Sequence, residues 1–325
     1  MIGRGIGVHF ALLGAAVAAS VFVWTRDKTP AVNAGDVTIW SARAADVERV
    51  SYEAKGRKIS LEARKDAQGR WYFGSAESAA PAGGAPPTKT SFVSVAQGEK
   101  LAEALAPLKG LREIGRVDDG RTTEFGLRQP EGSLVVLLAG KERRLDLGGQ
   151  APGGGSRYVR DTGSGTVYAV KGDVLHDLEA GEFSLYEHEL HGWKDADLKS
   201  VRVTAQGKTK DVLRSGPDAK RIWADPASPD KPDETAANWL AKVDRLKPNE
   251  YVTPQPSAPP VIARLDYLVR GAEGAYLEIA KIPAPPLPAP LADSAAASAP
   301  KPEYLVRTER TRLWAKVHAQ LGEQV

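Results

Sequence analysis

Residues 46–52 read DVERVSY, and residues 197–203 read DLKSVRV. In both stretches an aspartate precedes residues that largely alternate between apolar and polar, which is the pattern of a strand with one buried face. Each stretch is followed by a second strand signal that contains a tryptophan, Trp71 in the first case and Trp223 in the second. The sequence therefore predicts one structural module that occurs twice.

The ends of the two modules also match. Residues 157–160 (RYVR) and 166–169 (TVYA) resemble residues 303–306 (EYLV) and 312–315 (RLWA). In both endings the second aromatic residue stands ten positions after the first, which aligns Tyr158 with Tyr304 and Tyr168 with Trp314. We therefore predict three parts: residues 1–36 as a membrane anchor and tether, residues 37–182 as a first unit, and residues 183–325 as a second unit.

The strands at the start of the first unit are predicted from hydrophobic spacing. Val50, Tyr52, Ile59 and Leu61 fall on one face of a predicted hairpin, and residues 71–73 (WYF) form a third strand. The period then changes to that of a helix.

Leu101, Leu105 and Leu108 are spaced as on one helix face, and Pro107 is predicted to end or kink that helix. In the second unit, residues 233–235 (DET) form a predicted N-cap region for the corresponding helix. About four more strands complete each unit.

The predicted fold class is therefore α+β, with two tandem, mainly antiparallel β units that each carry one packed helix. Residues 75–91 and 283–302, which are rich in Ala, Pro and Ser, are predicted to be loops that project from the surface.

Composition excludes several classes of protein. The 325 residues contain no cysteine, which excludes disulfides, thiolate catalysis and cysteine-ligated metal sites. Acidic and basic residues are interspersed, and the net charge is only +3, so no basic face for nucleic acid is expected.

Residues 6–24 are apolar or small except His9 and Ser20, and at about 1.5 Å per residue they match the thickness of a bilayer core. Trp24 and basic residues follow, as at a membrane interface. We expect a retained anchor that contacts the lipid bilayer, with a cytoplasmic N-terminus and a periplasmic body at the bacterial inner membrane. A cleaved signal peptide is the alternative, because residues 16–20 (AVAAS) resemble a cleavage site. His9 could act within the membrane or simply reach its interface.

The chain resembles a bacterial family of membrane-anchored proteins, domain-of-unknown-function family 4340. The resemblance is carried by residues 124–130 (EFGLRQP), 147–148 (LG) and 158–160 (YVR), by the Gly-x-Trp turn at residues 69–71, and by the strand at residues 47–52. It implies an envelope protein whose partners are integral membrane subunits of a gliding-motility-type ABC transporter. The resemblance implies no catalytic residue and no cofactor.

Four groups of residues could carry chemistry. Residues 187–191 (EHELH) hold two imidazoles and two carboxylates, yet the histidines stand three apart, so we expect a solvated connection between the units rather than a metal site. Residues 148–155 (GGQAPGGG) lack the Lys and Ser/Thr of a phosphate-binding loop and predict a hairpin loop. Residues 163–165 (GSG) predict a turn. The fourth group consists of the tryptophans Trp71, Trp223, Trp239 and Trp314. They could stack on sugars, but we favour a place in the hydrophobic core for them.

We therefore expect a non-enzymatic accessory or scaffold subunit of an envelope ABC-transporter assembly that acts through protein–protein contacts. The alternatives left open are a module that binds an envelope glycan or lipid in the cleft between the units, and an enzyme.

Overall fold

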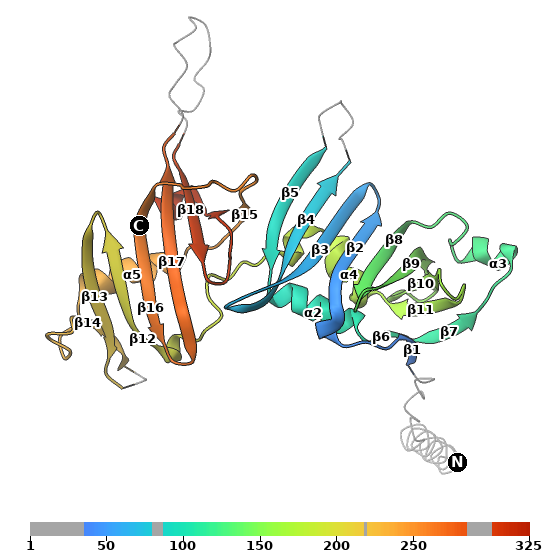
Figure 1. The fold of residues 1–325 in the computed structure, drawn as a ribbon, viewed down its shortest axis with the longest axis horizontal. Helices are drawn as coiled ribbons and strands as arrows, with labels where there is room; N and C mark the ends of the chain where they lie inside the picture. Colours follow the sequence, from blue (N-terminus) through green and yellow to red (C-terminus); the bar gives the residue numbers. More distant parts are fainter. Residues whose placement is uncertain (1–35, 80–86, 218–219, 285–300) are drawn as a thin grey trace, which may run out of the picture.

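The computed structural model describes residues 36–79, 87–217, 220–284 and 301–325, which form two large antiparallel sheets (Figure 1). The predicted α+β class with mainly antiparallel sheet is confirmed. Within these described ranges, no helix is long and apolar enough to cross a membrane. The predicted span over residues 6–24, including His9, lies outside them.

The first sheet has nine strands, and a short pair, β1 (Val37–Trp40) with β6 (Leu108–Gly110), stands beside it. Every neighbouring pair in the large sheet is antiparallel. In spatial order its strands are β5 (Thr88–Ser94), β4 (Gly69–Ser78), β3 (Arg57–Asp66), β2 (Val47–Ala54), β8 (Gly132–Leu138), β9 (Lys141–Gln150), β10 (Ser156–Asp161), β11 (Val167–Lys171) and β7 (Arg112–Gly115).

The second sheet has eight strands, which are also antiparallel throughout. In spatial order they are β14 (Ile222–Ala224), β13 (Lys208–Ser215), β12 (Leu198–Ala205), β16 (Val261–Val269), β17 (Ala272–Ile282), β18 (Glu303–Thr308), β19 (Ala315–Lys316) and β15 (Glu250–Tyr251).

The two sheets share one strand order. The sequence β4-β3-β2-β8-β9-β10-β11-β7 in the first has the same connectivity as β14-β13-β12-β16-β17-β18-β19-β15 in the second, and β5 is an added edge strand. The first sheet lies within residues 37–182 and the second within residues 183–325. The boundaries of the predicted units themselves stay a prediction.

The predicted alignment of the two endings is wrong by one residue. Val159 in β10 and Val306 in β18 are the equivalent residues of the two sheets. Val159 is opposite Tyr168, whereas Val306 is opposite Ala315. Tyr168 therefore corresponds to Ala315 and not to Trp314. Side chains alternate between the two faces of a strand, so a slip of one position changes the face. Aromatic spacing alone could not detect that slip.

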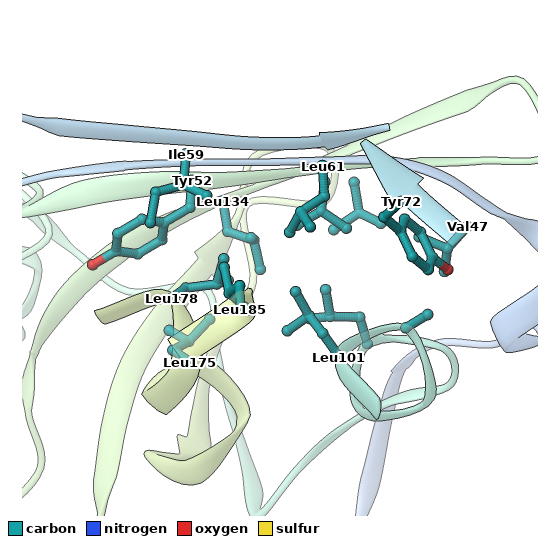
Figure 2. Packing of buried hydrophobic residues seen from close by; sticks show 14 of the residues in the cluster. Val47, Tyr52, Ile59, Leu61, Tyr72, Leu101, Leu134, Leu175, Leu178 and Leu185 are labelled. Atoms are coloured by element: carbon teal, nitrogen blue, oxygen red, sulfur yellow. The ribbon is translucent and has the colours of Figure 1, made fainter. Parts of the chain in front are cut away.

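The hairpin pattern at the start of the first unit is confirmed. Tyr52, Ile59 and Leu61 are buried on one face of β2 and β3, as is Val50. Figure 2 shows this face packed against leucines from three other elements, namely α2 (Ala96–Leu105), α4 (Asp173–Ala180) and the 3₁₀ turn η2 (Glu182–Leu185). Each fully buried leucine stabilises the fold by about 1.5–3 kcal/mol.

The helix boundaries follow the sequence signals. Helix α2 ends at Leu105, two residues before Pro107, as predicted, but Leu108, which was counted in the helical spacing, lies in strand β6. Helix α5 (Glu234–Val243) packs on the second sheet, and the Asp233 side chain accepts a hydrogen bond from the Ala236 N–H, which confirms the predicted N-cap.

Three segments differ from the prediction. Residues 75–91 were expected to form a loop, but β4 continues to Ser78 and β5 begins at Thr88, and residues 80–86 lie outside the described ranges. Strand β5 pairs with β4 along its whole length, and its Phe92 and Val93 are fully buried. The short edge strands β7 and β15 were not predicted, because they contain few apolar residues.

The glycines in the family-like motifs allow two backbone segments to approach closely. Gly126, at the end of the short helix α3 (Asp119–Glu124), has a φ of +67°. The Phe125 carbonyl oxygen accepts a hydrogen bond of 2.8 Å from the Gly149 N–H. A Cβ atom at Gly148 would lie 2.4 Å from the same oxygen, closer than real Cβ contacts. The motif is therefore structural.

We expect Gly148→Ala to lower the free energy of unfolding by about 2 kcal/mol or more, because a backbone atom must move to admit the methyl group. Gly149→Ala is the matched control, since its Cβ would meet nothing closer than 3.7 Å. Urea denaturation of the two variants measures the difference, and equal stabilities would contradict this account of the motif.

We expect Asp233→Ala to cost about 1 kcal/mol, because the start of α5 loses its cap. The hydrogen bond from Lys210, followed by that from the Ala236 N–H, lowers the pKa of Asp233. Its contribution is therefore complete above the usual carboxyl range and is lost as the pH falls through the lowered pKa. Thermal unfolding from pH 7 to about pH 3 should show this loss in the parent and in the exposed-site control Asp230→Ala, but not in Asp233→Ala.

Candidate functional site

The segment of residues 187–191, expected to be a solvated connection, is instead part of a buried junction between the two sheets. Glu187 is only 4% exposed, and Leu190 is also buried. No local pattern indicates this burial, because the residues that cover the segment come from distant positions in both units.

The Glu187 carboxylate binds groups from both sides of the junction. On the first-sheet side it accepts a hydrogen bond of 3.3 Å from the Ala96 N–H, and so caps α2, whose own N-cap residue Val95 provides no side-chain bond. On the second-sheet side it lies 3.0 Å from the Arg310 guanidinium. Its backbone carbonyl accepts a hydrogen bond of 2.9 Å from the Tyr251 hydroxyl.

Tyr251 fills the interior of the junction. It belongs to β15 of the second sheet, yet it packs in the hydrophobic core of the first. Its ring meets Tyr186 edge to face, with the centroids 5.6 Å apart, and Tyr186 packs against Phe92. Burial, followed by the charge of Glu187, raises the pKa of Tyr251 well above its usual range, so the hydroxyl stays a donor.

Further contacts join the sheets at the rim of the junction. The Arg312 guanidinium donates to the Asp66 carboxylate at 2.7 and 3.3 Å. The Ser91 N–H donates to the Thr253 hydroxyl at 3.2 Å. The junction therefore combines a buried core with polar bonds on both sides, and together these contacts join the two sheets.

The two histidines of the segment do not converge on one point. His191 Nδ1 lies 2.9 Å from a Glu309 carboxylate oxygen, whereas both ring nitrogens of His188 face backbone carbonyls. In the part of the chain that the structure describes, no group of three or more His, Cys, Asp or Glu residues is placed to hold a metal ion.

The other predicted groups take structural places. The loop within residues 148–155 joins β9 to β10 as a hairpin, and residues 163–165 form the turn from β10 to β11. Trp71, Trp223 and Trp314 are buried, as favoured from the sequence. Trp239 is half-buried, and its indole N–H donates to the Val325 carbonyl.

A hollow of about 590 Å³ lies at the rim of the junction. Trp193 is the aromatic residue in its wall. Its ionic residues include both signs and come mainly from the second unit: Lys194, Asp197, Arg270, Glu273, Glu309, Arg310 and Arg312.

A belt of alternating charges crosses the face of the second sheet that is opposite α5, and we call it the charged belt. It was not predicted, because only the pairing of five strands brings its members together. Arg202 pairs with Asp211 at 2.7 Å, Arg264 with Glu278 at 2.7 Å, and Arg307 with Glu278 at 2.6 Å. In order across the five strands its residues are Asp211, Arg202, Asp266, Arg264, Glu278 and Arg307.

Aromatic rings support two cations of the belt. The Arg264 guanidinium lies 5.0 Å from the centre of the Tyr276 ring, and that of Arg307 lies 4.6 Å from the Trp314 ring. The hydrogen bond with Asp266 raises the pKa of Arg264, and that with Arg202 lowers the pKa of Asp211. Both groups therefore stay ionised near neutral pH, so the belt is a fixed pattern of charge.

We expect Glu187→Gln to lower the free energy of unfolding by about 3 kcal/mol, because it leaves Arg310 without its counter-ion in a mostly buried site. Arg310→Gln should cost a similar amount, and the double variant should cost less than the sum. Glu189→Gln, which removes an exposed carboxylate two residues away, should change stability by less than about 0.5 kcal/mol. Additive effects in this double-mutant cycle would contradict a coupled pair.

Comparison with known proteins gives one match. The family model described as a domain of unknown function (DUF4340) covers residues 88–264, which is more than half of the 325 residues and runs from β5 through the junction into β16. No curated protein and no solved structure matches the chain. The chain belongs to the DUF4340 family.

Proposed function

We propose that this protein is a membrane-anchored accessory or scaffold subunit of an envelope ABC-transporter-type assembly and that it acts through protein–protein contacts. In this proposal residues 6–24 anchor it in the bacterial inner membrane, with the N-terminus in the cytoplasm and the two sheets in the periplasm. The class of partner, integral membrane subunits, comes from the family resemblance.

The charged belt is the observation that carries the proposal. The helix α5 packs on one face of the second sheet through Leu240 and Val243, whereas every belt residue except the buried Glu278 keeps more than a third of its side chain exposed on the other face. Fixed, alternating charges favour recognition of one complementary surface and disfavour others. The first sheet carries a shorter version, in which Asp146 pairs with Arg160 at 2.7 Å and lies 3.7 Å from Arg144.

The junction supports the same proposal. A scaffold needs two surfaces held together, and the hydrogen bonds and ion pairs of Glu187, Tyr251 and Arg312 join the two sheets. They also weigh against a glycan or lipid module with its site between the units, because Phe92 and Tyr186 fill the interior beside Tyr251.

We expect a photo-crosslinking amino acid at Thr204, on the belt face of β12, to capture an integral membrane protein when the full chain is purified in mild detergent. The matched control places the same amino acid at Lys242, which is exposed on α5. Capture from position 204 alone supports the proposal. A chain that purifies alone, with no crosslink from position 204, would count against it.

A further inference from the structure

The imidazole of His188 lies between two backbone carbonyl oxygens from opposite sides of the junction. Its Nδ1 atom is 3.1 Å from the Pro248 oxygen, on the segment that leads into β15 of the second sheet. Its Nε2 atom is 3.0 Å from the Phe183 oxygen in η2, which packs on the core of the first sheet through Leu185. The ring also lies against the Phe183 side chain, with the centroids 4.6 Å apart.

Carbonyl oxygens only accept hydrogen bonds, so the charge of the ring decides how many bonds it makes. A neutral imidazole carries one N–H and can donate to only one of the two oxygens, which leaves a nitrogen lone pair opposite an oxygen lone pair. The imidazolium carries two N–H groups and can donate to both oxygens. The second bond forms only after protonation, and it closes a bridge from one side of the junction to the other.

Charged residues of both signs lie on the segments that are packed around the ring. Glu187 and Glu189 flank it on its own segment, η2 carries Glu182, and the segment of Pro248 carries Lys247 and then Glu250. Arg310 pairs with Glu187, and Lys247 lies 3.6 Å from Glu189, so two of these carboxylates are partly balanced.

His191 shows the contrast three residues later. Its Nδ1 atom faces Glu309, but its Nε2 atom is buried and has no partner among the described residues. An imidazolium there would bury an unsatisfied N–H, which is costly. The arrangement with an acceptor at each nitrogen is therefore a property of the His188 position.

We propose that His188 forms a pH-sensitive hydrogen-bond bridge between the two sheets. On protonation His188 gains its second hydrogen bond and restricts the relative motion of the sheets. At higher pH one bond is lost and the junction loosens while Glu187 and Arg310 still hold it together.

The absence of native cysteines allows a direct test in the full-length protein in mild detergent. Nitroxide labels at Lys58→Cys and Lys208→Cys report the distance between the two sheets, since both positions are exposed, on β3 and β13 respectively. The population outside the main distance peak should fall by about fivefold between about pH 8 and about pH 5.5, the change expected for one hydrogen bond gained.

The response should be absent in His188→Gln and in His188→Phe, of which the second keeps a ring against Phe183 if the first fails to fold. It should persist in His176→Gln, which alters an exposed histidine on α4, and in His191→Gln. A pH-independent distance distribution in the parent chain would overturn the proposal. So would a response that survives both His188 variants or that disappears in His191→Gln.

Discussion

The arrangement of the two sheets depends on one buried carboxylate. Taking the Glu187 charge out of water costs several kcal/mol unless charged and polar groups replace the lost hydration. Here the replacements are the Arg310 guanidinium and the N–H groups of Ala96 and Glu189. Because Ala96 begins α2 and Arg310 follows β18, the groups that satisfy Glu187 also set the position of one sheet relative to the other.

The junction forms where the two otherwise similar units differ. Strand β5 has no counterpart in the second sheet, and the segment that contains Glu187 lies along its outer edge. There the Glu187 N–H donates a hydrogen bond to the Val93 carbonyl. The partner strand β15 is at an edge of the second sheet and carries Tyr251. Repetition of one strand order therefore produced two similar sheets, and an added edge strand joined them.

Much of the local structure could be predicted. Alternation at Val50 and Tyr52, the helix end before Pro107 and the cap at Asp233 all follow from rules that act over a few residues. The predictions failed where long-range pairing decided the outcome. Strand β5 has a loop-like composition but is held by β4 along its whole length. The alignment of Tyr168 with Trp314 failed because aromatic spacing is the same on either face of a strand, and only the pairing with β10 and β18 distinguishes the faces.

The sequence by itself determined most of the elements, the fold class and the family, because hydrophobic period, caps and glycine motifs are local properties of the chain. Only the tertiary structure decided the junction and the charged belt. Glu187 is hydrogen-bonded to Ala96, 91 positions away in the sequence, and His191 contacts Glu309, 118 positions away. No residue near Glu187 or His191 in the sequence therefore indicates its partner. The energy of a buried charge depends on the groups that surround it in space, and those groups are chosen by the packing of whole sheets.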